Sequence, residues 1–197
     1  ALAYQLYENN GVLKRDNVID YVKKLEQNDR KILRDLGVKF GRYHIFLFKL
    51  IKPEAVSLRT LLWKNYHQKY FKLNPPKFGL NFLDDKKLDQ KFMLLCGFEK
   101  FNNYFVRIDI LERLFMQIIN SNNAENKEIK LIPEMLNLLG CNKENFKKLL
   151  KNMNYKIIEK NNDIYFRYSP KKITKKIINQ KNKKDSPFKI LKDLQLN

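Results

Sequence analysis

The chain has 197 residues, of which 44% are hydrophobic and 13% aromatic, and its formal net charge is +19. This composition excludes wholesale disorder and is sufficient for one or two small domains. No run of about 18 uncharged apolar residues occurs, and the first residues lack a basic region followed by an apolar one, so neither a membrane span nor a signal peptide is predicted. Cys96 and Cys141 are too few for a disulfide framework, which favours a reduced, cytoplasmic setting.

The charge is the strongest single feature of the sequence. Forty basic residues stand against 21 acidic ones, a balance typical of proteins that bind a polyanion, with nucleic acid first and an anionic membrane surface second. The basic residues are 32 Lys and 8 Arg, accompanied by 23 Asn. This pattern also fits codons rich in A and T, so two explanations stay open for the lysines, selection for phosphate contacts and compositional drift.

Residues 1–72 are expected to form an accessory domain of helices and a strand. Two amphipathic helices are predicted, of which the second is closed by Gly37. Alternating apolar residues from Val38 to Leu47 then predict a half-buried strand that Gly41 interrupts. Helix, helix and strand make up half of a winged-helix pattern, which many small folds share.

A long helix is expected to begin at Pro53 and to end at about Phe71. Its apolar residues form one stripe on a helical wheel: Ala55, Val56, Leu58, Leu62, Trp63, Tyr66 and Tyr70. Arg59 lies in the middle of this stripe. Its guanidinium either extends to solvent or pairs with a carboxylate, or it presents planar donors in a groove to a phosphate or a base.

Residues 73–83 contain Pro and Gly and predict a linker to a second domain over residues 84–168. The end of that domain has the clearest pattern. A short helix begins at Pro133, and Asn142 caps a second helix that runs to about Met153. The following two apolar runs flank turn residues and predict a β-hairpin, which completes the order of a winged helix-turn-helix.

The predicted fold class is mainly α with short β-hairpins (α+β), a helical region followed by a winged-helix-like unit and a disordered basic tail. The tail covers residues 169–197, and nine Lys and two Asp give it +7 of the net charge. It ends in DSPFKILKDLQL (185–196). This end is either plain solvated tail or a short amphipathic segment that docks on a partner.

The helix expected from residue 143 separates an apolar face from a basic one. Its basic residues fall within about 140° of arc at about 100° per residue, and they are Lys143, Lys147, Lys148 and Lys151. Placed second in a helix-turn-helix, this helix has the geometry of a recognition helix. Lysines favour phosphate contact over base reading, although a solvated face of a Lys-rich protein is the plain alternative.

Further basic residues complete the predicted nucleic-acid-binding set: Lys156, Lys160 and Arg167 on the hairpin, together with Arg59 and Arg42. The hairpin residues are expected to extend the surface of the lysine-bearing helix. Tyr165 is expected to point away from Ile164 and Phe166, where its ring is available for stacking on an unpaired base.

No catalytic pattern is present in the sequence. It contains no GxxxxGK[ST], GxSxG, HExxH or EF-hand motif. His44 and His67 are isolated in the sequence and are expected to be structural, and both cysteines to be small apolar positions. We therefore assign no catalytic residue, metal ligand or cofactor within this chain.

One long block of sequence carries a family resemblance. LRDLGVKFGRYHIFLFKLIKPEAVSLRTLLW (33–63) contains an LGVxFGR-type strand, an apolar linker ending in KP, and an LRxLLW helix, in that order. VRIDILERL (106–114), IPEMLNLLGC (132–141) and DSPF (185–188) add shorter matches. Together they resemble the C-terminal region of bacterial superfamily-two helicases related to the mitochondrial degradosome RNA helicase.

The resemblance implies an accessory part of an enzyme that couples ATP hydrolysis to unwinding of RNA or RNA–DNA duplexes. The ATPase motifs of that family lie in two RecA-like domains upstream, so ATP and Mg are implied only for those domains. The absence of an initiator Met is expected of a piece of a longer chain. The expected function is thus nucleic-acid binding beside a helicase motor, with RNA favoured, in a bacterial cytoplasm. The alternative is a scaffold that docks an exoribonuclease or ribosome partner through the tail.

Overall fold

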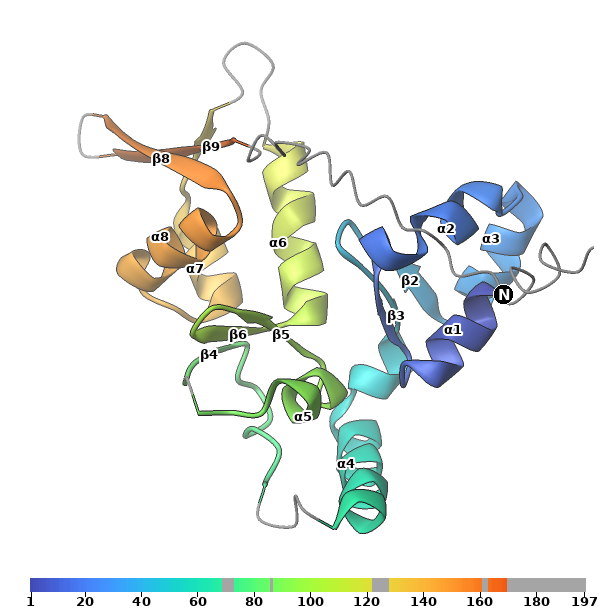
Figure 1. Ribbon diagram of the computed structural model, residues 1–197. Coiled ribbons are helices and arrows are strands. Elements are labelled where there is room, and N and C mark those ends of the chain that lie inside the picture. The colour runs from blue at the N-terminus through green and yellow to red at the C-terminus, as the bar shows by residue number, and fades with distance from the viewer. Residues whose placement is uncertain (69–72, 86, 122–127, 161–162, 170–197) are drawn as a thin grey trace, which may run out of the picture.

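The computed structural model describes residues 1–68, 73–85, 87–121, 128–160 and 163–169 (Figure 1). Helices and small antiparallel sheets alternate along the described residues, and the strands found there form three sheets of three strands each. The predicted tail, including its DSPF segment, lies outside the described residues. Within the described part, no helix is long and apolar enough to cross a membrane.

The first unit covers residues 1–51. Its elements are α1 (Leu2–Glu8), β1 (Val12–Lys14), η1 (Arg15–Val18), α2 (Ile19–Lys24), α3 (Gln27–Asp35), β2 (Val38–Phe40), β3 (His44–Leu47) and η2 (Phe48–Ile51). Strand β3 lies between β1 and β2 in the sheet. The helices cover this sheet with a small apolar core formed by Leu2, Leu6, Leu13, Val18, Val22, Val38 and Ile45.

The second unit covers residues 52–107. Its elements are α4 (Pro53–His67), β4 (Phe82–Asp84), α5 (Gln90–Leu95), β5 (Phe98–Phe101) and β6 (Tyr104–Arg107), with β6 central in the sheet. Pro53 suits the first turn of α4 because its missing N–H has no partner there anyway. The side chain of Asp89 caps α5 by accepting a hydrogen bond of 2.7 Å from the backbone N–H of Phe92.

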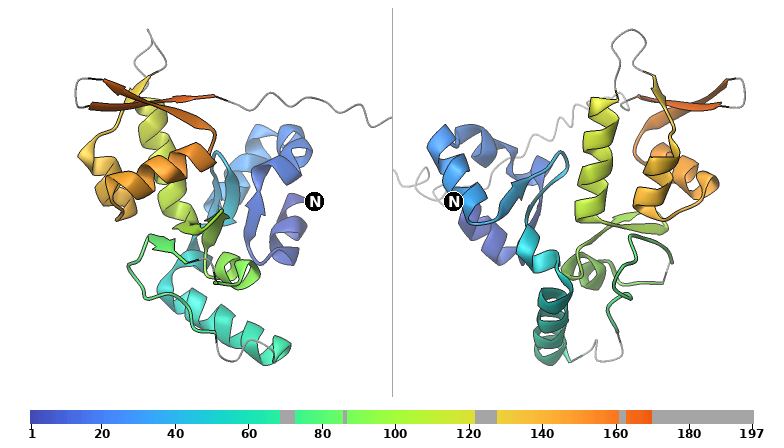
Figure 2. Two further views of the ribbon diagram at one scale, coloured as in Figure 1. Left: turned by 60° about the vertical axis from the view of Figure 1, so that its left-hand side comes forward. Right: turned by 180° about the vertical axis from the view of Figure 1, so that it is seen from behind.

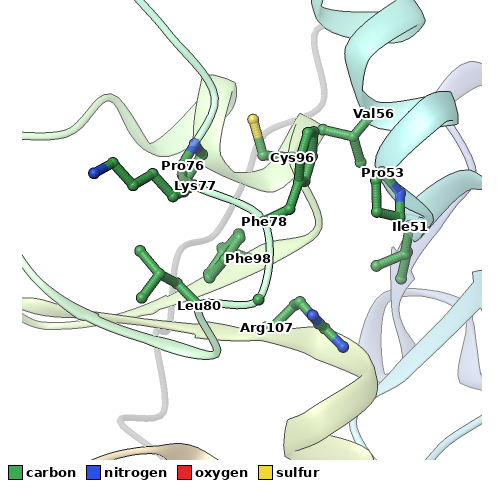
Figure 3. A pocket seen from close by; sticks show the side chains of 11 residues that line it. Ile51, Pro53, Val56, Pro76, Lys77, Phe78, Leu80, Cys96, Phe98 and Arg107 are labelled. Carbon is green, nitrogen blue, oxygen red and sulfur yellow. The ribbon is translucent and has the colours of Figure 1, made fainter.

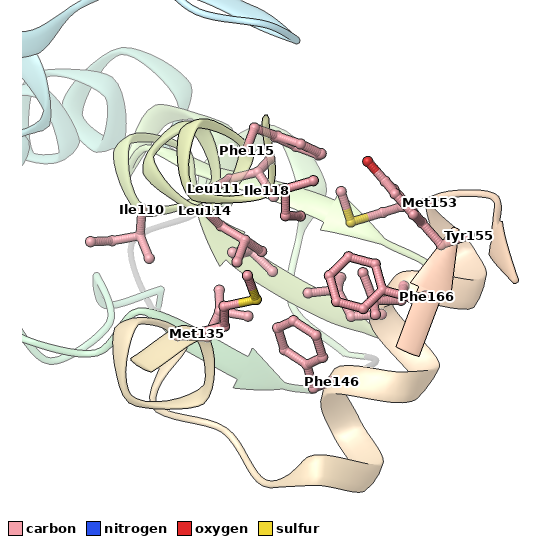
Figure 4. Close-up of a cluster of buried hydrophobic side chains, with 14 of the residues drawn as sticks. Ile110, Leu111, Leu114, Phe115, Ile118, Met135, Phe146, Met153, Tyr155 and Phe166 are labelled. Atoms are coloured by element: carbon pink, nitrogen blue, oxygen red, sulfur yellow. The ribbon is translucent and has the colours of Figure 1, made fainter. Parts of the chain in front are cut away.

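The third unit covers residues 108–169. Its elements are α6 (Ile108–Asn120), β7 (Ile129–Lys130), α7 (Pro133–Leu139), α8 (Lys143–Asn152), β8 (Tyr155–Lys160) and β9 (Asp163–Tyr168), with β9 central. Figure 4 shows its core, in which Leu111 and Leu114 of α6 face Met135, Phe146 and Phe166. All five side chains are fully buried.

Among the described residues, the first and third units share one order of elements, a helix, a strand, two helices and a β-hairpin, and the second unit has the same order with α5 as the single helix between its first strand and its hairpin. In each unit a left-handed residue ends the last helix before the β-hairpin: Gly37 (φ 92°), Gly97 (φ 85°) and Asn154 (φ 64°). The carbonyl of each accepts a hydrogen bond from the residue that follows the last strand, namely Phe48 (3.3 Å), Ile108 (2.9 Å) and Ser169 (2.9 Å). The repeated backbone geometry identifies α3, α5 and α8 as equivalent helices.

Helix α6 joins the third unit to the first. In Figure 1 and in the right-hand view of Figure 2 it stands between the β2–β3 hairpin on one side and α7 with α8 on the other. The ring of Tyr43, in the β2–β3 turn, packs on Phe115 of α6 with the ring centroids 4.1 Å apart. The three units are thus in contact rather than strung out along the chain.

The predicted linker differs from the sequence-based expectation in two respects. The predicted linker over 73–83 contains the start of β4, a strand of the second sheet. In addition, Val56 and Trp63 of α4 pack with Phe92 of α5, so that one apolar core extends across the predicted linker. A three-residue strand is too short to give a readable alternation, which is why composition alone indicated a linker.

The apolar stripe predicted for α4 does not form one buried face. Val56 is 3% exposed, whereas Leu58 and Leu62 are 57% and 59% exposed and Tyr66 is 84% exposed. A helical wheel cannot tell an apolar face that meets a core from one that does not, because both have the same spacing.

Candidate nucleic-acid interface

Helix α8 carries the basic face that the sequence predicted. It begins at Lys143 because Asn142 caps it, with the side-chain oxygen accepting a hydrogen bond of 2.8 Å from the backbone N–H of Asn145. Phe146, Leu149 and Leu150 are completely buried on its inner side (Figure 4 labels Phe146). The lysine face of α8 comprises Lys143, Lys147, Lys148 and Lys151, of which Lys147 is half-buried and the others are exposed.

Lys147 is partly committed within the protein. Its ammonium group forms an ion pair with the carboxylate of Glu159 on β8. The hydrogen bond from Lys147, and then the charges of Lys147 and Lys151, lower the pKa of Glu159. Lys143 and Lys148, by contrast, have no acidic partner among the described residues. The positive charge of α8 that is available to a ligand therefore lies mainly on Lys143 and Lys148 and less on Lys147.

The hairpin residues lie on the opposite face of the sheet from Glu159. Strand alternation places Lys156 and Lys160 on that outer face, and Arg167 is paired directly with Lys156 across the two strands. Like charges directly opposite each other repel, and neither Lys156 nor Arg167 has an acidic partner in the described part of the chain. The basic residues thus form two separate groups, one on α8 and one on the opposite face of the hairpin. They do not form the single continuous surface expected from the sequence.

Lys130 on β7 belongs to the same outer sheet face, and the sequence analysis missed it. It pairs in register with Tyr165 and forms an ion pair with Asp163. Lys160 lies over the Tyr165 ring, with its Nζ 5.8 Å from the centroid. We define the outer sheet face as Lys130, Lys156, Lys160, Tyr165 and Arg167. Strand β7 has only two residues, so its pairing with a hairpin more than 30 residues away had no local signal.

Arg59 holds two units together through backbone carbonyls. Its guanidinium donates to the carbonyl of Leu50, at 2.9 Å, and to that of Asn10. Burial lowers the pKa of Arg59. The carboxylate partner considered for this residue is therefore not what it contacts, and these two hydrogen bonds fix α4 against the first unit.

Arg42 lies at the exposed tip of the β2–β3 turn, where the first unit meets the third. The carboxylate of Glu112 on α6 enters this turn and accepts hydrogen bonds from the backbone N–H groups of Arg42, Tyr43 (2.9 Å) and His44 (2.8 Å). A Cβ built on Gly41 would overlap this carboxylate. Only glycine leaves the space that the carboxylate occupies. The single strand predicted from Val38 to Leu47 is therefore wrong: these residues form the antiparallel hairpin β2–β3, and Gly41 lies in its turn.

A group of charged side chains, of which His44, Glu99 and Glu112 are buried and Lys14 is exposed, continues this contact into the second unit. His44 lies 3.3 Å from Glu112 through Nδ1 and 3.0 Å from Glu99 through Nε2, and Lys14 donates to Glu99 at 2.7 Å. We call Lys14, His44, Glu99 and Glu112 the inter-unit cluster. The sequence shows the individual histidine and acidic residues, but their proximity in space depends on how the units pack. No local sequence pattern encodes that packing.

The pKa values in the inter-unit cluster move in opposite directions. Burial lowers the pKa of His44, but its hydrogen bonds to Glu112 and Glu99, and the charges of both, outweigh this and raise it overall. Burial raises the pKa of Glu99, but the hydrogen bonds from His44 and Lys14 and their charges prevail and lower it overall. These shifts favour a protonated His44 between two carboxylates, which is a structural role.

The two cysteines have protonated thiols. Cys96 lines a small pocket between the loop before β4 and the second sheet, shown in Figure 3, with Phe78 pointing towards the Val56 side of the pocket. Burial raises the pKa of Cys96 to about 12 and that of Cys141 to about 11. Thiols with such pKa values are poor nucleophiles at neutral pH.

Comparisons with known proteins found no matching family model, no matching curated protein and no matching solved structure.

Proposed function

We propose that this chain is a nucleic-acid-binding accessory region of an ATP-dependent helicase, with RNA the favoured ligand. The observation that carries this proposal is the presence of exposed cations without acidic partners, among the described residues, on both sides of the third unit: Lys143 and Lys148 on α8, and Lys156 and Arg167 on the outer sheet face. The helicase relationship is supported by the sequence block over residues 33–63.

We further propose that the first and third units are winged helices and that the second unit is a reduced form with a single helix, α5, before its hairpin. Support comes from the order of elements in the third unit, in which α7 and α8 form a helix-turn-helix and β8 with β9 forms the wing. The sheet order β7-β9-β8 recurs as β1-β3-β2 and β4-β6-β5. In a winged helix the second helix of the helix-turn-helix and the wing are the parts that contact nucleic acid, and here both are basic.

The binding mode we propose is contact with the phosphate backbone. Lysines act as point charges on phosphates and read bases poorly. Two cations directly opposite each other, Lys156 and Arg167, repel in the free protein and are stabilised when an anionic phosphate lies between them. Such binding is independent of sequence and weakens steeply with salt, because each phosphate that the protein neutralises releases counterions.

The test uses the full chain and two charge-neutralised variants, Lys143→Gln with Lys148→Gln, and Lys156→Gln with Arg167→Gln. Fluorescence anisotropy measures binding to short single-stranded and duplex RNA and DNA in about 0.1 M salt. From a salt slope of about 0.9 per neutralised phosphate, removing one lysine–phosphate interaction is expected to weaken binding by about eightfold.

The matched control neutralises Lys87 and Lys91, which are exposed in the second unit. Its affinity is expected to stay within about twofold of the original, since these residues lie outside both the lysine face of α8 and the outer sheet face. Equal affinity in the control and in both test variants, with all of them folded, contradicts the proposal.

A second candidate function is docking of an exoribonuclease or ribosome partner. A specific observation favours it. An apolar groove lies between α1 and α3 of the first unit and Arg59 of α4, and it is lined by residues that include Tyr7, Leu36 and Leu50. Tyr7 and Leu36 are 80% and 66% exposed. Exposed apolar surface of this kind marks protein interfaces. Loss of partner capture in Leu36→Glu, or on truncation after Ser169, with nucleic-acid affinity retained would support docking.

A further inference from the structure

The first unit presents a helix that is equivalent to α8 and is also accessible. The left-handed residues Gly37, Gly97 and Asn154 place α3, α5 and α8 at the same position in the three units. Helix α5 offers little surface to a ligand because it has only six residues, of which Phe92, Met93 and Leu95 are 1%, 1% and 5% exposed. Helix α3, in contrast, has no buried residue.

The exposed side of α3 has a chemistry different from that of α8. Gln27, Asn28, Lys31 and Arg34 are all exposed and together line one shallow concavity on the surface. At about 100° per residue these four positions span about 120° of arc, so they form a single stripe. Two amides and two different cations in one stripe provide both donors and acceptors, whereas the lysine face of α8 provides only donors.

The stripe is held in place by contacts of Leu33 and Arg30 on other sides of α3 and by a contact of Arg34 within the stripe. Leu33 packs against the core of the first unit, and Arg30 donates a hydrogen bond of 2.9 Å to the carbonyl of Val22 at the end of α2. Arg34 lies over the Phe40 ring of β2 at 5.8 Å. The helix is therefore fixed to both α2 and the hairpin, and a fixed helix can position side chains for directional hydrogen bonds.

The charge of α3 argues against simple phosphate binding. Arg30, Lys31 and Arg34 are accompanied by the exposed Asp29 and Asp35, so the helix carries only +1. In α8 four lysines face a single Glu144, which gives +3. Phosphate repels the two aspartates, so the strength of α3 as a ligand surface lies in its hydrogen-bonding groups rather than its net charge.

We propose that the stripe Gln27, Asn28, Lys31 and Arg34 contacts base edges and gives the protein a sequence preference, which rests on the proposed nucleic-acid-binding function. Side-chain amides match the edge of adenine, and Arg or Lys matches the edge of guanine. The base edges come from one of two sources, the major groove of duplex DNA or unpaired bases in an RNA loop, since the major groove of an RNA duplex is too narrow for side chains.

The experiment selects preferred sequences with the full chain from two probe pools, a DNA duplex with a randomised centre and an RNA hairpin with a randomised loop. The affinity for the selected probe is then compared with that for its scrambled version. We expect a preference of about 10- to 100-fold, as one or two good base contacts provide. The pool that becomes enriched identifies the source of the bases.

The variant Gln27→Ala with Asn28→Ala and Lys31→Ala is expected to reduce this preference to about twofold or less. Its affinity for the scrambled probe is expected to change by less than about tenfold, as befits the removal of one lysine, and Lys87→Ala with Lys91→Ala serves as the control. Circular dichroism confirms folding of each variant. The absence of any enriched sequence, or a preference that the α3 variant retains in full, overturns this inference. Binding to the scrambled probe measures the contribution of α8 and the outer sheet face independently of any sequence preference. Either of these two negative results therefore leaves the proposed function intact. If the chain binds no probe at all, both the proposed function and this inference are wrong.

Discussion

Glu112 is the single side chain on which the junction between the first and third units depends most. Replacing it by alanine removes the acceptor for three backbone N–H groups of the β2–β3 turn and one partner of His44. Glu112 is only 8% exposed, so solvent reaches the vacated position poorly. We therefore expect Glu112→Ala to destabilise the folded chain strongly.

The magnitude follows from the environment of the three donors. A hydrogen bond to a charged group contributes about 1.5–3 kcal/mol, and a buried donor left without a partner costs about 1–3 kcal/mol. Of the three, the N–H of His44 is buried, while those of Arg42 and Tyr43 are partly buried and can recover part of the loss by bonding to water. The expected loss is about 3–5 kcal/mol, the range for breaking a buried charged pair.

Urea unfolding followed by far-ultraviolet circular dichroism and by the fluorescence of Trp63, the one tryptophan of the chain, measures this loss. Glu8→Ala is the matched control, since Glu8 is exposed and a change at such a surface position alters stability by no more than about 0.5 kcal/mol. A loss below about 1 kcal/mol for Glu112→Ala would refute the reasoning, because it would mean that the turn keeps its conformation without the carboxylate.

Three further predictions concern stability. Because the pKa of His44 is raised in the folded chain, its contribution to the unfolding free energy is complete below about pH 6.5 and is lost as the pH rises through the folded-state pKa. The pKa of Glu99 is lowered, so its contribution to the unfolding free energy is lost as the pH falls through the folded-state pKa. The contribution of the inter-unit cluster to the unfolding free energy is therefore greatest between about pH 4.5 and 6.5, and His44→Gln should flatten the decline on the alkaline side in urea titrations. Gly41→Ala displaces the Glu112 carboxylate and should cost about 2–4 kcal/mol; a double-mutant cycle should show that this loss and that of Glu112→Ala are not additive. Asn142→Ala removes the cap of α8 and should lower the midpoint of urea unfolding by an amount that corresponds to about 1 kcal/mol.

The elements with strong local signals were predictable from the sequence. Pro133 and Asn142 mark the starts of α7 and α8 as expected, and the two runs after residue 154 form the predicted hairpin β8–β9. The buried and basic sides of α8 also follow from helical periodicity alone. Capping residues and periodicity act within a few positions of the chain, which is why they can be read without a structure.

The repetition of the unit was not predicted, although it leaves a trace in the sequence. Gly37 and Gly97 stand at the same point of two related segments, GVKFGRYHIFL and GFEKFNNYFVR. In the third unit Asn154 takes this left-handed position, and each strand of the hairpin is longer, which hides the correspondence. Only the shared hydrogen-bond pattern makes the equivalence evident.

The candidate site was predictable in its residues but not in its arrangement. The sequence indicated Lys156 and Arg167, yet the face of the sheet that they occupy is set by strand alternation with Tyr155 and Phe166, which are buried on the inner face. Arg59 was also singled out correctly as unusual. Its partners are backbone carbonyls from a distant part of the chain, and a carbonyl carries no side-chain signature.

The measurement that tests the central claim most directly is the salt dependence of RNA binding, made with the full chain and with a chain that ends at Ser169. If the folded third unit grips phosphates, the shorter chain retains binding, and its affinity falls steeply with salt, with a slope of about −0.7 per neutralised phosphate on single strands. If binding disappears together with residues 170–197, the affinity resides in a nonspecific basic tail, and the account of the folded surface is wrong.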